Sequence, residues 1–259
     1  NYEINQNNKI YFSLSKAHRE PTRGDFENNI NIQPEELIDY ELGWKYNAEK
    51  FFFNSNLYYM GYKNQLVLTG ALDDVGSPLR ENSGKSYRTG IELESVYKAT
   101  NKLNISANIS FSENKNVDYK TNYNGVITDW GDTDISFSPN VISSAGIQFS
   151  ASQDLTFTLL NKFVGNQYMS NTESNISKLS SYSTTDLNIL YTIKNSAYFS
   201  EIIVTAMINN IFNKEYVSNG YYYTYDDTWS DPNLITTIEG TGYYPQAKRN
   251  FLLGLTFKL

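Results

Sequence analysis

Apolar and polar residues alternate with a period of two over long stretches of this chain. The clearest stretch is 103–112, where isoleucine, leucine and phenylalanine interleave strictly with asparagine and serine. Such alternation gives a β-strand one apolar and one polar face. It predicts ten antiparallel strands, at residues 9–18, 36–46, 51–68, 86–98, 103–113, 140–151, 154–168, 181–193, 201–213 and 247–259. Most of them reach the roughly 9–11 residues that a tilted strand needs to cross a bilayer.

The connections between these strands alternate in length. Four are short, at 47–50, 99–102, 152–153 and 194–200, and five are long, at 19–35, 69–85, 114–139, 169–180 and 214–246. In an up-and-down meander all the long connections then fall at one end, which is the pattern of outer-membrane barrels with short periplasmic turns and long extracellular loops. Alternation alone also fits a soluble barrel with an apolar interior. Strand length, loop parity and the aromatic residues at strand ends (Tyr46, Phe51 and Tyr97) favour an all-β, antiparallel, up-and-down transmembrane β-barrel.

Composition narrows the class of protein further. The 259 residues include 22 Tyr, 14 Phe and no Cys, and the formal net charge is -7. The mean hydropathy of -0.50 does not oppose a membrane barrel, because alternating strands average to neutral. The acidic charge excludes nucleic acid as a partner, and the lack of cysteine excludes disulfides and thiolate metal sites. The chain starts at Asn1 without a signal peptide, so we expect a mature form or, preferably, a fragment.

Six segments, in the family's order, resemble the TonB-dependent outer-membrane receptor family. They are Tyr-Phe-Ser-Leu-Ser-Lys-Ala-His-Arg-Glu-Pro-Thr at 11–22, Pro-Glu-Glu at 34–36 with Tyr-Glu-Leu-Gly-Trp-Lys at 40–45, Leu-Tyr-Tyr-Met-Gly-Tyr-Lys-Asn-Gln-Leu at 57–66, Gly-Ile-Glu-Leu-Glu at 90–94, Ile-Asn-Asn-Ile-Phe-Asn-Lys-Glu-Tyr at 208–216, and Tyr-Pro at 244–245 with Arg-Asn-Phe at 249–251. The chain departs from the family pattern at His18, at Glu20 and at its last residue, Leu259 in place of the usual Phe.

The resemblance implies a 22-stranded barrel in the bacterial outer membrane, of which residues 1–259 form the C-terminal part, without the plug domain and the early strands. It implies active import rather than catalysis, with TonB and the plug acting through the full-length receptor. Further implied partners are outer-membrane lipid, the barrel-assembly machinery and a small-molecule metal chelate. The expected cargo is a ferric siderophore or another iron chelate; cobalamin, haem or an oligosaccharide is the alternative within the class. A passive ten-stranded porin or adhesin, or a barrel enzyme, is the alternative outside it.

Candidate ligand contacts lie in the loops and on the polar strand face. Aromatic and carboxylate side chains stack on planar or sugar surfaces and accept hydrogen bonds, while arginines attract an anionic chelate. The candidates are Arg80, Arg88, Trp130, Tyr221, Tyr223, Tyr225, Asp227 and Trp229. The terminal strand supplies a lipid-facing set for barrel assembly: Phe251, Leu253, Leu255, Phe257 and Leu259.

No catalytic constellation or resident cofactor is expected. The chain has one histidine, His18, which is more often a polar surface residue than a haem ligand. Glu92 and Glu94 share a strand face, so pairing with Arg88 or a neighbouring lysine is favoured over acid–base work. The carboxylates of the acidic loops 118–134 and 221–231 are of the type that binds calcium, so loop-bound calcium is a further expectation.

Overall fold

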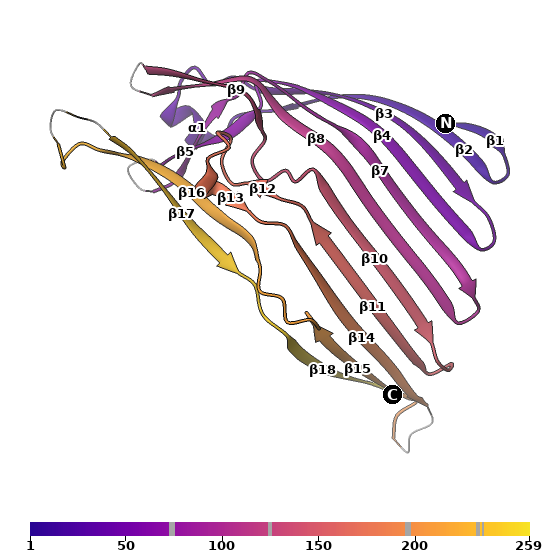
Figure 1. Ribbon diagram of the computed structural model, residues 1–259. Coiled ribbons are helices and arrows are strands. Elements are labelled where there is room, and N and C mark those ends of the chain that lie inside the picture. Colours follow the sequence, from indigo (N-terminus) through magenta and orange to yellow (C-terminus); the bar gives the residue numbers. More distant parts are fainter. Residues whose placement is uncertain (73–75, 124–125, 195–197, 232–233, 235) are drawn as a thin grey trace.

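The computed structural model describes residues 1–72, 76–123, 126–194, 198–231, 234 and 236–259. Within them the chain forms 18 strands, one short α-helix and one 3-10 turn. Twelve strands form one antiparallel sheet, which curves into an open trough and does not close (Figure 1). The fold is therefore a partial barrel. Of the described residues, none lies in a helix long and apolar enough to cross a membrane.

All ten strands expected from the alternation are present in the large sheet. They are β2 (Asn8–Arg19), β3 (Glu35–Asn47), β4 (Phe51–Lys63), β7 (Lys85–Thr100), β8 (Leu103–Tyr123), β10 (Val141–Ser150), β11 (Leu155–Val164), β14 (Tyr182–Lys194), β15 (Glu201–Asn209) and β18 (Asn250–Lys258). Short turns join them in hairpins at one end of the trough, and the longer connections gather at the other end (Figure 1). An additional short strand, β1 (Tyr2–Asn5), pairs with β2 at one edge of the sheet, and β18 forms the other edge.

The apolar faces of successive strands are aligned by the register. One continuous row runs from β4 to β18 through directly paired residues: Phe51, Tyr97, Ile105, Ile147, Leu159, Leu187, Ile208 and Phe251. A one-residue slip in any pair would move that strand's apolar set to the other face. The convex face is thus an apolar band, as lipid requires.

Aromatic rings gather on this face beside the short turns. Phe51 lies 6.1 Å from Tyr46 and 6.4 Å from Tyr97, and Trp44 lies 5.5 Å from Phe53, measured between ring centroids. This cluster matches the aromatic girdle expected at a membrane interface.

The expected boundaries are wrong at several strand ends. The stretch 51–68 is not one strand: Asn64 adopts a left-handed φ of 57°, and the chain leaves the wall as β5 (Leu66–Leu72). β11 stops at Val164, and Gln167–Tyr168 pairs instead as β12 with β13 (Lys178–Leu179). β15 stops at Asn209, because Asn210 has a φ of 51°.

Several connections expected as loops contain paired strands. β8 continues to Tyr123 and pairs with β9 (Val126–Asp134). β16 (Val217–Asp227) pairs with β17 (Thr236–Pro245) inside the connection 214–246. β16 also pairs in parallel with β5, which itself pairs with β6 (Pro78–Asn82). Residues 73–75, 124–125, 195–197, 232–233 and 235, which belong to the expected connections, lie outside the described residues.

The buried apolar side chains lie at the end with the long connections or in the strand parts next to it, rather than within the trough. Ile32, Leu66, Val67, Tyr119, Ile135, Val164, Met169 and Leu179 are all buried. We call the long connections together the loop lobe, which comprises the described residues within 20–34, 64–84, 114–140, 165–181 and 210–249. Strand polar groups line the trough, and this lobe holds the packed core.

Candidate ligand-binding site

The concave face of the trough is polar because the residues between the apolar ones point there. Arg88 on β7 lies on this face, and its guanidinium donates to Ser138 Oγ at 2.8 Å and to Asn114 Oδ1 at 3.4 Å. Both partners are neutral. Glu92 and Glu94 form no ion pair with Arg88 or with any lysine in the described part of the chain, so the expected pairing is wrong. In the described part of the chain Arg88 forms no ion pair, and it lines a hollow of about 290 Å³ on the concave face together with Glu41 and Glu92.

Arg80 is placed differently. Its guanidinium lies 3.5 Å from Asp25 Oδ1, and Asp25 is only 5% exposed. Asp25 also closes a capping box with Thr22 at the start of α1 (Arg23–Asn28). Burial opposes ionisation of Asp25, but hydrogen bonds from Thr22 and the charge of Arg80 outweigh it and hold its pKa below the usual value. Arg80 therefore ties α1 to β6, and its charge is already neutralised.

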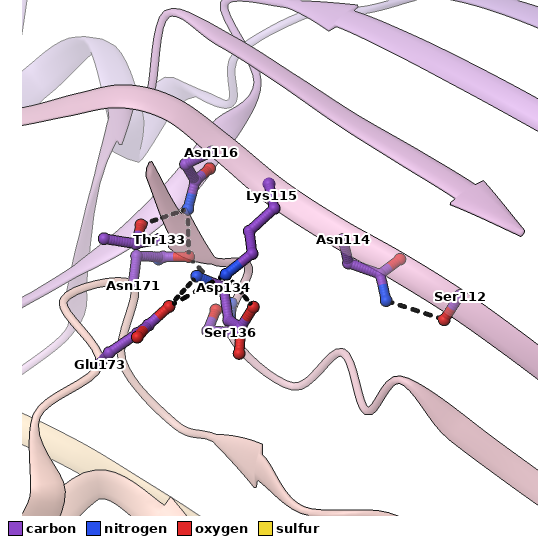
Figure 2. Close-up of polar contacts among 9 residues, drawn as sticks. All are labelled: Ser112, Asn114, Lys115, Asn116, Thr133, Asp134, Ser136, Asn171 and Glu173. Carbon is purple, nitrogen blue, oxygen red and sulfur yellow. Dashed lines mark hydrogen bonds and ion pairs between the residues drawn. The ribbon is translucent and has the colours of Figure 1, made fainter. Parts of the chain in front are cut away.

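A network of polar side chains joins separate connections of the loop lobe (Figure 2). The amide of Asn171, 1% exposed, donates to the carbonyl of Leu68 at 2.9 Å and accepts from Ser136 N at 2.9 Å and Asn116 Nδ2 at 3.3 Å. Glu173 Oε1 accepts from Asp134 N at 2.5 Å. The segment 165–181 is thereby held against β5 and the β8–β9 hairpin.

A second buried contact joins β8 to β6. The hydroxyl of Tyr119, which is completely buried, donates to Glu81 Oε1 at 2.9 Å. Burial raises the pKa of Glu81 above its usual value, although the hydrogen bond from Tyr119 opposes that rise. Burial and the neighbouring Glu81 together raise the pKa of the Tyr119 hydroxyl far above the usual value. The pair joins two connections that are far apart in sequence.

A cavity of about 820 Å³ opens between β5 and β16 in the loop lobe. Its walls include Leu68, Phe137, Met169, Gly220 and Tyr222. This volume falls in the range of small-molecule sites, and the apolar walls with few polar groups are typical of them. Phe137 lines both this cavity and the hollow that holds Arg88, so the two spaces share a wall.

Four of the expected ligand contacts form one series of stacked rings, three on β16 and one, Trp229, just after it. Tyr221, Tyr223, Tyr225 and Trp229 follow one another at 6.1, 6.3 and 6.0 Å between ring centroids. Asp227 accepts backbone hydrogen bonds from Trp229 at 3.1 Å and Ser230 at 3.0 Å, which fixes the turn that carries Trp229. The structure therefore brings together five of the eight residues expected at a site.

The remaining three lie apart from that series. Trp130 is on β9, where its indole donates to Thr121 Oγ1 at 3.0 Å, while Arg80 and Arg88 occupy the places described above. His18 is exposed near the end of β2, opposite Glu36. Among the described residues, no three His, Asp or Glu side chains gather closely enough to hold a metal ion, so loop-bound calcium stays a prediction.

The terminal strand carries its apolar set on one exposed face. Phe251, Leu253, Leu255 and Phe257 pair across with Ile208, Ala206, Val204 and Ile202 of β15, which continues the apolar band of the convex side. Leu259 follows the strand and is exposed. Their role in barrel assembly stays a prediction.

The family profile described as "TonB dependent receptor-like, beta-barrel" matches residues 1–211. The chain belongs to this family of outer-membrane transport receptors. No curated protein sequence matches the chain.

Solved structures share its fold. The siderophore receptor PiuA from Acinetobacter baumannii superposes with a TM-score of 0.72 at 20% identity, over 99% of this chain and 34% of that one. The copper transporter OprC gives 0.71 at 17% identity, over 100% of this chain and 38% of that one. The ferric yersiniabactin uptake receptor FyuA from Yersinia pestis gives 0.66 at 16% identity, over 98% and 35%. The chain thus spans about a third of the length of these receptors.

Proposed function

We propose that the chain is the C-terminal part of a bacterial outer-membrane receptor that imports a ferric siderophore or another iron chelate, energised by TonB. The family match carries this proposal, because its members are transport receptors and not enzymes. In the full-length receptor a plug domain and the remaining strands would complete the 22-stranded barrel. Outer-membrane lipid would surround it, and the barrel-assembly machinery would insert it.

Charge and shape support an anionic metal chelate as the cargo. The Arg88 guanidinium donates to the neutral side chains Asn114 and Ser138 and forms no ion pair in the described part of the chain, although Glu41 and Glu92 line the same hollow. The apolar cavity shares Phe137 with the hollow at Arg88. A chelate with an apolar body and an anionic metal-binding head could place the body in the cavity and the head toward Arg88. A charge-assisted hydrogen bond is about twice as strong as a neutral one.

Uptake of radiolabelled ferric siderophores by iron-starved cells tests the proposal. Deletion of the full gene should abolish uptake of at least one siderophore in a panel, and the intact gene should restore it. Arg88→Gln should lower that uptake about tenfold or more at limiting concentration, since losing a charged hydrogen bond costs roughly 1.5–3 kcal/mol.

Arg80→Gln is the matched control, because Asp25 already neutralises that guanidinium. It should loosen the loop lobe, seen as faster protease cleavage near α1, without a comparable loss of affinity. Unchanged uptake of every siderophore in the deletion strain would rule out the iron assignment. Equal losses in both variants would rule out Arg88 as the anion contact.

A further inference from the structure

The two faces of the β16–β17 hairpin differ in how their aromatic side chains are used. On one face Tyr222 donates to Glu239 Oε1 at 2.6 Å, and Tyr243 donates to the carbonyl of Ile176 at 3.0 Å. That face packs on the segment 165–181 and on Gly70, where an added Cβ would lie 2.8 Å from the ring of Tyr222. Its tyrosines are therefore part of the packed loop lobe.

The opposite face carries an uninterrupted series of five rings, of which four are exposed and Tyr223 is half-buried. Tyr244 lies 6.0 Å from Tyr221, at the end of the series that runs through Tyr223 and Tyr225 to Trp229. We call these five rings the aromatic ladder. Tyr221 and Tyr244 are each 51% exposed, and Trp229 is 68% exposed. Within the described part of the chain, no side chain or backbone group pairs with their four hydroxyls or the indole N–H.

Glycines on β17 make the ladder possible. Tyr221 pairs with Gly242, and Tyr223 pairs with Gly240. A Cβ at Gly242 would lie 2.2 Å from the Tyr221 ring, and one at Gly240 would lie 2.3 Å from the Tyr223 ring. The two rings therefore extend across the neighbouring strand, over positions that carry no side chain. This arrangement widens the exposed aromatic surface.

The charge of the hairpin limits what can bind there. Between residues 217 and 245 the sequence contains Asp226, Asp227, Asp231 and Glu239, and no Lys, Arg or His. Like charges across an interface cost binding free energy, so an anionic chelate is disfavoured at the ladder. The ladder and the hollow at Arg88 therefore favour ligands of different charge.

The polar groups of the ladder limit the ligand further. A lipid chain or an apolar peptide face would cover the hydroxyls and the indole N–H and leave them without partners, which is unfavourable. A sugar ring has an apolar C–H face that packs on an aromatic ring, and hydroxyls that both donate and accept. On the ladder face the Asp227 carboxylate, next to Trp229, is a further acceptor for such hydroxyls, whereas Asp226 and Glu239 already accept from Thr237 and Tyr222.

We propose that the aromatic ladder is a binding surface for a neutral, linear oligosaccharide, with successive sugar rings stacked along Tyr244, Tyr221, Tyr223, Tyr225 and Trp229. The series of rings follows an extended strand, which fits a linear chain better than a compact ligand. Tyr221 and Tyr223 also line the 820 Å³ cavity, whereas Tyr225, Trp229 and Tyr244 lie outside the lining of that cavity and of the hollow at Arg88.

Glycan-array binding by the purified full-length receptor in detergent, followed by calorimetry on the best neutral oligosaccharide, tests the proposal. Tyr225→Ala and Trp229→Ala should each weaken binding about tenfold, and Tyr225→Phe should keep most of it because the ring remains. Tyr222→Phe is the matched control: it removes a hydroxyl from the packed face of the same strand and should leave affinity unchanged.

Three results would overturn the proposal. The first is binding of anionic glycans only, or of none on the array. The second is unchanged affinity in Tyr225→Ala and Trp229→Ala. The third is an equal loss in Tyr222→Phe, which would show that the variants act through hairpin folding. Oligosaccharide affinity in Arg88→Gln should stay at the parental level, so this test and the Arg88 uptake test fail separately.

Discussion

Asn171→Ala is expected to release the segment 165–181 from the rest of the loop lobe. The side chain is almost fully buried and bonds three groups: the carbonyl of Leu68, the backbone N–H of Ser136 and the amide of Asn116. Alanine keeps the backbone but removes every one of these bonds. The Ser136 N–H, which is partly buried, then loses its partner.

The magnitude follows from these contacts. An unpaired buried N–H costs about 1–3 kcal/mol, and each lost hydrogen bond contributes about 0.5–1.5 kcal/mol more. Asn116 still donates to Thr133 at 3.3 Å, which limits the loss at that end. We expect the local opening free energy to fall by about 2–4 kcal/mol, which corresponds to roughly 30- to 1,000-fold faster amide exchange.

Hydrogen–deuterium exchange on the full-length receptor measures this change directly. Peptides that cover residues 133–138 and 166–172 should exchange faster, while peptides from β10 and β11 should not change. Asn175→Ala is the matched control, because Asn175 is exposed in the same segment and should shift exchange by less than about 0.5 kcal/mol. Equal exchange in the two variants would refute the role assigned to Asn171.

Two further predictions concern Glu81 and the terminal strand. Because the folded pKa of Glu81 is raised, its protonated form stabilises the fold below the ordinary Glu pKa, and this stabilisation is lost as the pH rises through the raised value. Amide exchange in β6 should therefore accelerate over that pH range, and Glu81→Gln should make the exchange less dependent on pH. An equally steep pH profile in Glu81→Gln would contradict the prediction. Replacing Phe257 and Leu259 with Asp should block barrel assembly, since carboxylates on the lipid face are unfavourable. Thr256→Asp, on the opposite face of the strand, should still assemble. Heat-modifiable gel mobility measures assembly, and normal assembly of the double variant would refute the assignment of Phe257 and Leu259 to the lipid face.

Local patterns were enough to predict the trough wall. The period of two in stretches such as 103–112 specifies both the strand and its lipid face, and the parity of loop lengths specifies which end carries the long connections. Strand ends were predicted less well, because the left-handed backbone conformation of a residue such as Asn64 or Asn210 depends on where the following segment packs. The alternation at 51–68 continued past such a residue and gave no sign of it.

The loop lobe could be predicted only in part. Its bonds join residues far apart in sequence, such as Asn171 with Leu68 and Tyr119 with Glu81, and no local period signals them. Arg80 looked like an anion contact because nothing nearby in sequence indicated its pairing with Asp25. Four rings of the aromatic ladder, at 221, 223, 225 and 229, were predicted as ligand contacts, but Tyr244 and the pairing with glycines were not. Alternating tyrosines at 221–225 face alternating glycines at 240 and 242.

The account predicts that the turns lie in the periplasm and the loop lobe lies outside the cell. The chain contains no cysteine, which makes single-cysteine labelling well suited to test this. In intact cells expressing the full-length receptor, with any other cysteine replaced, a membrane-impermeant maleimide should label Thr228→Cys beside the ladder. Asn101→Cys, in the short turn between β7 and β8, should react only after the outer membrane is permeabilised. Labelling of Asn101→Cys in intact cells with protection of Thr228→Cys would contradict the orientation on which the import proposal depends.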